Sequence, residues 1–199
     1  MSHYKSNLRD IEFNLFEVFR AQDRMGTGPY TEIDAETARE ILEEVERLAT
    51  GPLAASFADA DRNPPVYDPV TCTVTMPEAF KKSYAALMES GFWNLDLPRH
   101  LGGTHAPPSL RWAASELMLG ANPPAFMFMS GPGFAAILDH LGNEDQKRTA
   151  QIMIDRQWGA TMVLTEPDAG SDVGAGRTKA VQNEDGTWNI TGVKRFITS

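Results

Sequence analysis

The sequence contains only one cysteine, Cys72, among its 199 residues. A single cysteine excludes a disulfide within the chain, and it is consistent with a reducing compartment such as the cytoplasm, where we expect the protein to act. Basic residues are also scarce, because 18 Lys and Arg stand against 27 Asp and Glu. The resulting net charge of −9 argues against a nucleic-acid-binding surface, which needs clustered positive charge.

Long hydrophobic runs are missing as well. The most apolar stretch, residues 123–138, is interrupted by two glycines and three prolines. It falls short of the ~20 uninterrupted apolar residues that a membrane-spanning helix needs. The first ten residues have no apolar stretch of signal-peptide length. We therefore expect neither a membrane span nor an export signal.

Several signatures of enzyme sites are absent too. Gly174–Gly176 begins like a dinucleotide-binding fingerprint but lacks its third glycine, and neither a P-loop nor a Gly-x-Ser-x-Gly elbow occurs. Asp96, His100 and His105 lie close in sequence, yet no cysteine or further histidine is near them. We expect no metal site.

Hydrophobic residues recur with the helical period through most of the first 159 residues. Asp34 is placed to cap one helix, and Asn143 with Gln146 forms a capping-box pattern at the start of another. Residues 57–75 lack the period and are expected to form a long surface loop. Residues 125–141 are apolar nearly all round and are expected in the middle of a helical bundle. The helices expected from these patterns cover residues 7–20, 35–50, 77–90, 109–119, 125–141 and 143–157.

Beyond Gly159 the hydrophobic period changes toward two. Residues 160–164 and 193–198 are expected to form strands, and residues 179–182 and 187–191 flank an Asn-Glu-Asp-Gly hairpin turn. The small residues 168–172 suit either an ordinary turn or a loop whose N–H groups hold phosphate.

The predicted fold class is therefore α+β, and the sequence predicts two domains. An N-terminal helical bundle with an N-terminal extension covers residues 1–159, and the beginning of an antiparallel β-domain covers residues 160–199. The chain looks truncated, because its last apolar strand would have no neighbours.

Two short segments carry the most specific signal, TEPDAGSD at residues 165–172 and KRFITS at residues 194–199. The pair resembles the flavin-binding signature of the acyl-CoA dehydrogenases, and the resemblance extends over most of the chain. It implies an FAD-dependent α,β-dehydrogenation of an acyl-CoA thioester, as in fatty acid β-oxidation, with hydride transfer to N5 of the flavin. It also implies a homo-oligomer and an electron acceptor such as an electron-transfer flavoprotein.

The same resemblance places cofactor contacts on residues of both segments. Thr165 and Thr198 would offer hydroxyls to the polar edge and the N5 region of the isoalloxazine, and Phe196 would flank the ring. Ser171 would lie near the phosphates and the thioester, which makes it a substrate-binding candidate as well. Many family members have tyrosine at the position of Met162 and tryptophan at that of Phe196, so substrate contacts do not transfer directly. The remaining expected FAD contacts are Met162, Val163, Leu164, Gly170 and Ile197.

No catalytic residue is expected within these 199 residues, because the family's base is a glutamate in a later helical domain. Glu166 is expected to order the flavin loop instead. Residues 127–129 could line an acyl-chain pocket or pack in the core. The chain is thus interpreted as a fragment of an acyl-CoA dehydrogenase, inactive in isolation. The alternatives are a flavin-binding relative of the stress or DNA-damage-response type that does not dehydrogenate, and a helical interaction module.

Overall fold

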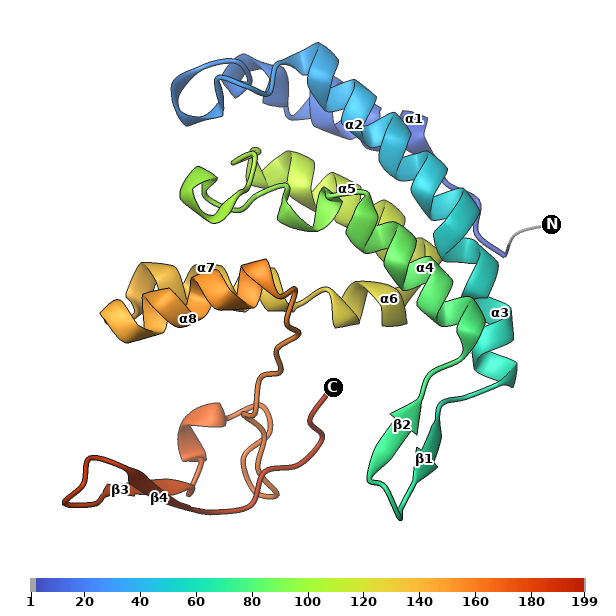
Figure 1. Cartoon of the computed structure of the whole chain (residues 1–199). Helices are drawn as coiled ribbons and strands as arrows, with labels where there is room; N and C mark the ends of the chain where they lie inside the picture. The colour runs from blue at the N-terminus through green and yellow to red at the C-terminus, as the bar shows by residue number, and fades with distance from the viewer. Residues whose placement is uncertain (1–2, 199) are drawn as a thin grey trace. The chain divides into compact units, whose positions relative to one another are not determined.

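The computed structural model describes residues 3–198 and divides the chain into two compact units, Met1–Gly159 and Ala160–Ser199. The first unit is built of helices with one small hairpin, and the second contains a hairpin between long loops (Figure 1). This is the α+β arrangement that the sequence predicts, with helices followed by antiparallel β-structure.

Helices lie at most of the predicted places in the first unit, but the single helix predicted at residues 7–20 is the short α1 (Leu8–Glu12) followed by a π-helical stretch, Phe13–Val18. Asp34 caps the second helix by accepting a hydrogen bond from the backbone N–H of Thr37 at 2.8 Å. The capping box of Asn143 and Gln146 is present in both directions. No helix in residues 3–198 is long and apolar enough to cross a membrane. The helices are α1 (Leu8–Glu12), α2 (Ala35–Leu48), α3 (Ala54–Arg62), α4 (Glu78–Glu89), α5 (Pro108–Ala121), α6 (Pro123–Phe128), α7 (Gly131–Leu141) and α8 (Glu144–Asp155).

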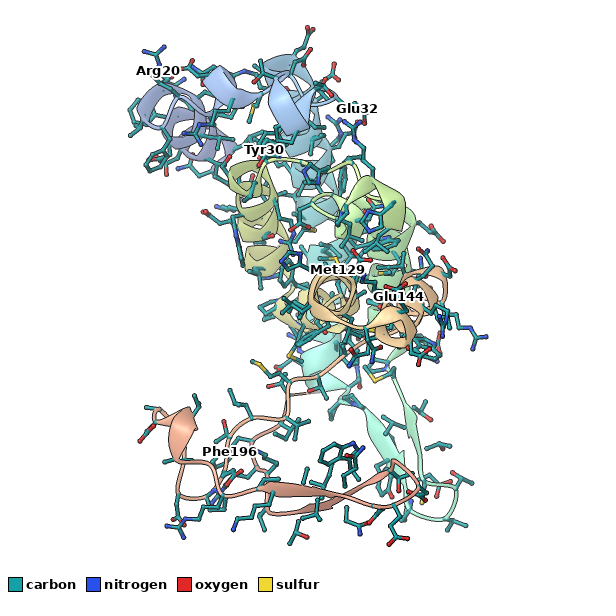
Figure 2. All side chains as sticks on the ribbon, turned by 90° about the vertical axis from the view of Figure 1, so that its left-hand side faces the viewer. Arg20, Tyr30, Glu32, Met129, Glu144 and Phe196 are labelled. Carbon is teal, nitrogen blue, oxygen red and sulfur yellow. The ribbon has the colours of Figure 1, made fainter. Side chains whose placement is uncertain are left out.

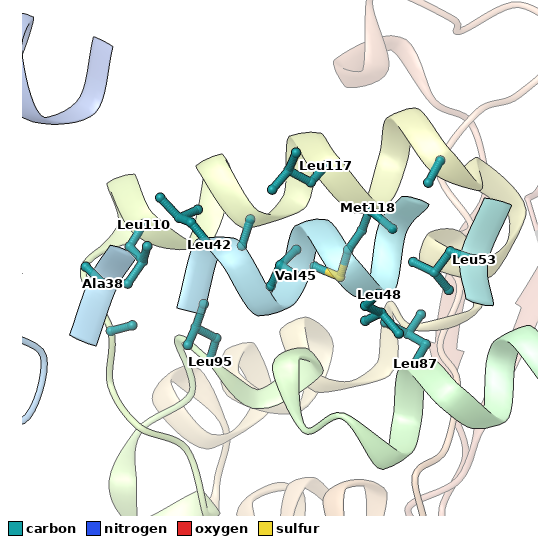
Figure 3. Close-up of a cluster of buried hydrophobic side chains, with 14 of the residues drawn as sticks. Ala38, Leu42, Val45, Leu48, Leu53, Leu87, Leu95, Leu110, Leu117 and Met118 are labelled. Carbon is teal, nitrogen blue, oxygen red and sulfur yellow. The ribbon is translucent and has the colours of Figure 1, made fainter. Parts of the chain in front are cut away.

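One hydrophobic core joins α2, α4 and α5 (Figure 3). Leu42 and Val45 of α2, Leu87 of α4, and Leu110 and Leu117 of α5 are all fully buried. Their spacing within each helix matches the 3.6-residue period, so each helix presents one apolar face to its neighbours. Burial of such side chains supplies the main driving force for folding this unit.

The expectation of a long loop at residues 57–75 is wrong. The chain passes through Gly51 and Pro52 in a π-helical turn, Ala49–Leu53, and continues directly into α3. Ser83 Oγ donates to the carbonyl of Pro52 at 2.6 Å, which helps satisfy a backbone group at the irregular turn. After α3, strands β1 (Val66–Asp68) and β2 (Thr73–Thr75) form an antiparallel hairpin.

The placement of residues 125–141 in the middle of a bundle is also wrong for the described chain. The segment breaks after Phe128 into α6 and α7, and Leu141 is 76% exposed at the end of α7. Met129 does pack in the core, and the ring of Phe128 meets those of Phe80 and Tyr84 edge to face. Core packing therefore accounts for Met129, whereas Phe128 is 38% exposed.

The second unit contains the predicted hairpin, formed by β3 (Lys179–Gln182) and β4 (Trp188–Thr191) with Lys179 opposite Thr191. Gly186 in its turn has a φ of +84°, a conformation that glycine adopts without a steric penalty.

The two other predicted strands are not present as strands. Residues 160–164 and 193–198 have irregular backbone, and Phe196 interrupts the second segment with a φ of +57°. A strand needs repeated ladder hydrogen bonds to a neighbour. A backbone hydrogen bond to the second segment, from Arg195 N at 3.0 Å, is accepted by the carbonyl of Thr165, just after the first segment.

Candidate functional site

The two segments predicted to bind flavin lie side by side in the second unit. Besides the hydrogen bond between Arg195 and Thr165, Lys194 Nζ donates to the carbonyl of Leu164 at 2.8 Å. The hydroxyl of Thr161 donates to the carbonyl of Thr198. Residues 161–165 and 194–198 therefore run next to each other, although 28 residues separate them in the sequence. Ser199, the last residue of the second segment, lies outside the described residues.

Three groups from other parts of the second unit bind the carboxylate of Glu166. Its carboxylate accepts hydrogen bonds from the backbone N–H of Arg177 at 2.6 Å and of Thr178 at 3.0 Å. It also forms an ion pair with Lys194 Nζ at 2.8 Å. Lys194 contributes most to lowering the pKa of Glu166 from 4.5 to about 2, followed by the side chain of Thr178 and then by the N–H groups of Arg177 and Thr178. Glu166 thus orders the loop, as the sequence predicts.

The loop after Glu166 is a tight turn. Glu166 and Ala169 exchange both backbone hydrogen bonds, at 3.1 and 3.2 Å, across Pro167 and Asp168. The N–H of Ala169 is therefore engaged within the loop and is not free to hold a phosphate. Gly170 and Ser171 follow this turn and are exposed.

The apolar side chains at the candidate site are largely uncovered in the described chain. Met162 is 62% exposed, and Val163 and Leu164 are also exposed. Phe196, labelled in Figure 2, is 78% exposed. Ile197 and Thr165 are half-buried, and Thr198 is exposed. The guanidinium of Arg195 lies over the Phe196 ring, 4.2 Å from its centroid. One face of that ring is therefore already occupied.

This arrangement fits an isoalloxazine group chemically. Exposed apolar side chains lie beside the hydroxyls of Thr165 and Thr198, and a flavin ring has an apolar body with a polar edge. The structure brings the residues around Thr165 together with those around Thr198. Ser171 lies beyond the Glu166–Ala169 turn and is exposed. The carboxylate of Glu166 is engaged by three donors.

Potential metal ligands do not cluster in the described part of the chain. No group of three or more His, Cys, Asp or Glu side chains lies close enough to hold an ion between residues 3 and 198. His100 instead pairs with Asp139, with 2.7 Å between Nε2 and Oδ2.

Sequence reasoning missed the partners of Glu166. The ion pair with Lys194 could have been predicted from the sequence. One motif contains an acidic residue and the other a basic residue, and opposite charges pair when the two motifs are adjacent. The backbone N–H donors of Arg177 and Thr178 carry no sequence signal at all, since every residue except proline offers one.

The whole chain has relatives of known name. It is 56% identical over 199 residues to the broad-specificity linear acyl-CoA dehydrogenase FadE5 of Mycobacterium tuberculosis, covering 100% of this chain and 33% of that protein. It is 31% identical over 200 residues to the 3-methylmercaptopropionyl-CoA dehydrogenase of Ruegeria pomeroyi, covering 98% of this chain and 33% of that protein. The chain thus spans about a third of the length of the curated relatives it matches, as the expectation of a fragment requires.

A solved structure supports the fold. The FAD complex of an acyl-CoA dehydrogenase from Bacillus anthracis matches 84% of this chain and 27% of its own, with a TM-score of 0.62 and 21% identity. No protein-family model matches the chain.

Proposed function

Because the chain belongs to the acyl-CoA dehydrogenase family, we propose that the full-length protein is an FAD-dependent enzyme that dehydrogenates acyl-CoA thioesters. The adjacency of residues 161–165 and 194–198 carries the proposal, because it places the two segments of the flavin signature next to each other. The relative at 56% identity is named for linear acyl-CoAs, so a linear acyl chain is the substrate class to test first.

The domain assignment is part of this proposal. Residues 1–159 would form the N-terminal helical domain, and residues 160–199 would form the opening of the flavin-binding β-domain. The division of the structure into units at Gly159 and Ala160 supports this assignment.

The chain's own residues would bind and orient the cofactor. Met162, Val163, Leu164, Phe196 and Ile197 would pack against the ring, and Thr165 and Thr198 would donate to its polar edge. Bound FAD would supply the hydride acceptor of the reaction. Gly170 and Ser171 would approach the phosphates, with Ser171 also near the substrate. The base that removes the α-proton would lie outside these residues.

The partners belong to the same proposal. An electron-transfer flavoprotein would reoxidise the flavin, and the full-length protein would form a homo-oligomer. A cytoplasmic location is supported by the single cysteine, which suits a reducing compartment.

Flavin content tests the proposal directly. The full-length protein, purified without added cofactor, is expected to show a flavin spectrum and to release FAD on denaturation. A protein that carries no flavin and binds none when FAD is added would contradict the proposal and would favour a helical interaction module.

A further inference from the structure

Three separate stretches of the second unit meet at the carboxylate of Glu166. One is the segment of Glu166 itself, which follows Thr165 directly. The second is the entry to β3, where Arg177 and Thr178 donate their N–H groups. The third is the segment of Lys194, whose ammonium group bridges the Glu166 carboxylate and the carbonyl of Leu164, each at 2.8 Å. The ammonium group of Lys194 thus links the two flavin segments, in addition to the hydrogen bonds from Arg195 to Thr165 and from Thr161 to Thr198.

The burial of this carboxylate distinguishes it from its neighbours. The Glu166 side chain is 7% exposed, the lowest value for a carboxylate in any ion pair found within residues 3–198. Asp168, in the same loop, is 73% exposed in its pair with Arg177. A buried ion pair has a desolvation cost that is often not recovered as stability, and its best-attested use is to specify one arrangement.

The space around this pair is also closed to other side chains. A Cβ atom at Gly176 would lie 3.2 Å from Glu166 Oε1, and one at Gly192 would lie 2.1 Å from Thr178 Oγ1. Gly176 lets the backbone approach the carboxylate closely, and Gly192 lets it approach Thr178, whose N–H donates to that carboxylate. The arrangement therefore has little freedom to readjust if the charge is removed.

From this geometry we infer that Glu166, paired with Lys194, is a positioning residue for the flavin. The pair holds the segment of Thr165 at a fixed distance from the segment of Thr198. It thereby determines how tightly FAD is bound and at what potential it is reduced. The inference rests on the proposed function. Glu166 would place the residues that contact FAD without touching FAD itself.

The test uses the full-length protein with FAD and four single variants. Glu166→Gln and Lys194→Met each remove one charge of the pair. Glu184→Gln and Lys179→Met remove exposed charges from the β3–β4 hairpin as matched controls. Each variant is measured for its FAD dissociation constant and its flavin reduction potential. Thermal unfolding of the flavin-free protein is recorded in parallel.

We expect Glu166→Gln and Lys194→Met each to raise the FAD dissociation constant about tenfold or more, because each leaves the other member of the pair without its opposite charge. Both should shift the reduction potential, and both controls should stay within about twofold, as exposed charges contribute little. The double variant should be no worse than the poorer single variant, because it removes both charges of one pair.

Either of two results would overturn the inference and leave the proposed function standing. One is an unchanged FAD affinity and reduction potential in Glu166→Gln, even if the flavin-free protein is less stable. The other is a loss of FAD affinity in the double variant that equals the sum of the losses in the two single variants. A wild-type protein that binds no FAD would overturn the proposed function, and this inference with it.

Discussion

At the scale of single residues, Thr165 is the side chain on which the cofactor assignment can be tested most cleanly. It lies between the carbonyl of Leu164, which Lys194 holds, and the carboxylate of Glu166. Its neighbours therefore fix its backbone on both sides, so a change in its side chain should leave the local fold intact.

Thr165→Val in the full-length protein should weaken FAD binding by roughly tenfold, because it deletes one hydrogen bond to a buried polar edge while keeping the side chain's shape. Equilibrium dialysis of FAD measures the effect. Thr191→Val, at an exposed position in β4, is the matched control. Equal affinities in wild type and Thr165→Val would remove Thr165 from the proposed site.

Glu166 gives a prediction about pH. Its pKa is lowered from 4.5 to about 2 in the folded state, mainly by Lys194. The carboxylate therefore stabilises the loop fully above pH 4.5, and this contribution is lost as the pH falls from 4.5 toward about 2. Hydrogen exchange at the amides of Arg177 and Thr178, corrected for intrinsic rates, should show protection falling over that range.

Glu166→Gln is the control for this effect. Its loop should be less protected above pH 4.5 and should lack the wild-type decrease, since glutamine does not titrate. A wild-type profile that matches the variant's would show that the carboxylate does not hold the loop.

Part of the candidate site could be predicted from the sequence. The role of Glu166 in ordering the loop follows from its place inside the flavin motif. Its pairing with Lys194 depends on the adjacency of segments separated by 28 residues, which the motifs suggest. The donors from Arg177 and Thr178 are backbone N–H groups, which cannot be identified from the type of residue.

At the scale of elements, Asn122 joins three parts of the helical unit. Its side-chain oxygen caps α6 by accepting from the N–H of Ala125 at 3.2 Å. Its amide nitrogen donates to the carbonyl of Leu53 at 2.9 Å and to Ser56 Oγ at 3.0 Å. The residue is 1% exposed, so no water can replace these bonds if the side chain is removed.

Asn122→Ala should reduce the free energy of unfolding by about 2–4 kcal/mol, as it removes a cap and leaves buried groups unpaired. Asn143→Ala removes the exposed cap of α8 and should cost only about 1 kcal/mol. Denaturant unfolding of both variants provides the comparison. Similar losses at the two positions would contradict the central role of Asn122.

The elements that the sequence predicts correctly are those with local signals. Helix α2 has its period and the Asp34 cap, and the β3–β4 hairpin has its Asp-Gly turn. Helix α3 was missed because Gly51 and Pro52 normally end a helix, whereas here a π-helical turn accommodates them. The strands expected at 160–164 and 193–198 do not form. A strand needs ladder hydrogen bonds to a neighbouring strand, and the pattern within a segment does not show whether that neighbour is present.

At the scale of the whole molecule, many large apolar side chains remain uncovered in these 199 residues. The second unit alone exposes Val181, Trp188, Ile190, Val193 and Phe196. Exposed apolar surface of this extent is typical of surfaces that bind another polypeptide or another domain.

The isolated chain of 199 residues should therefore self-associate, and Ile190→Thr should reduce its apparent size in gel filtration. Supplied with FAD, acyl-CoA and an artificial electron acceptor, the isolated chain should show no turnover, because the expected base is not among its residues. A monomer that turns over would contradict the assignment of the base to another domain.

We propose that the full-length protein uses FAD to dehydrogenate an acyl-CoA. Anaerobic titration of the purified protein with a linear saturated acyl-CoA tests it most directly. We predict that the visible flavin absorbance is lost as substrate is added and returns when an electron acceptor is supplied. A bound flavin that keeps its oxidised spectrum with every linear acyl-CoA tested would contradict the claim, and it would place the protein among flavin-binding relatives that do not dehydrogenate.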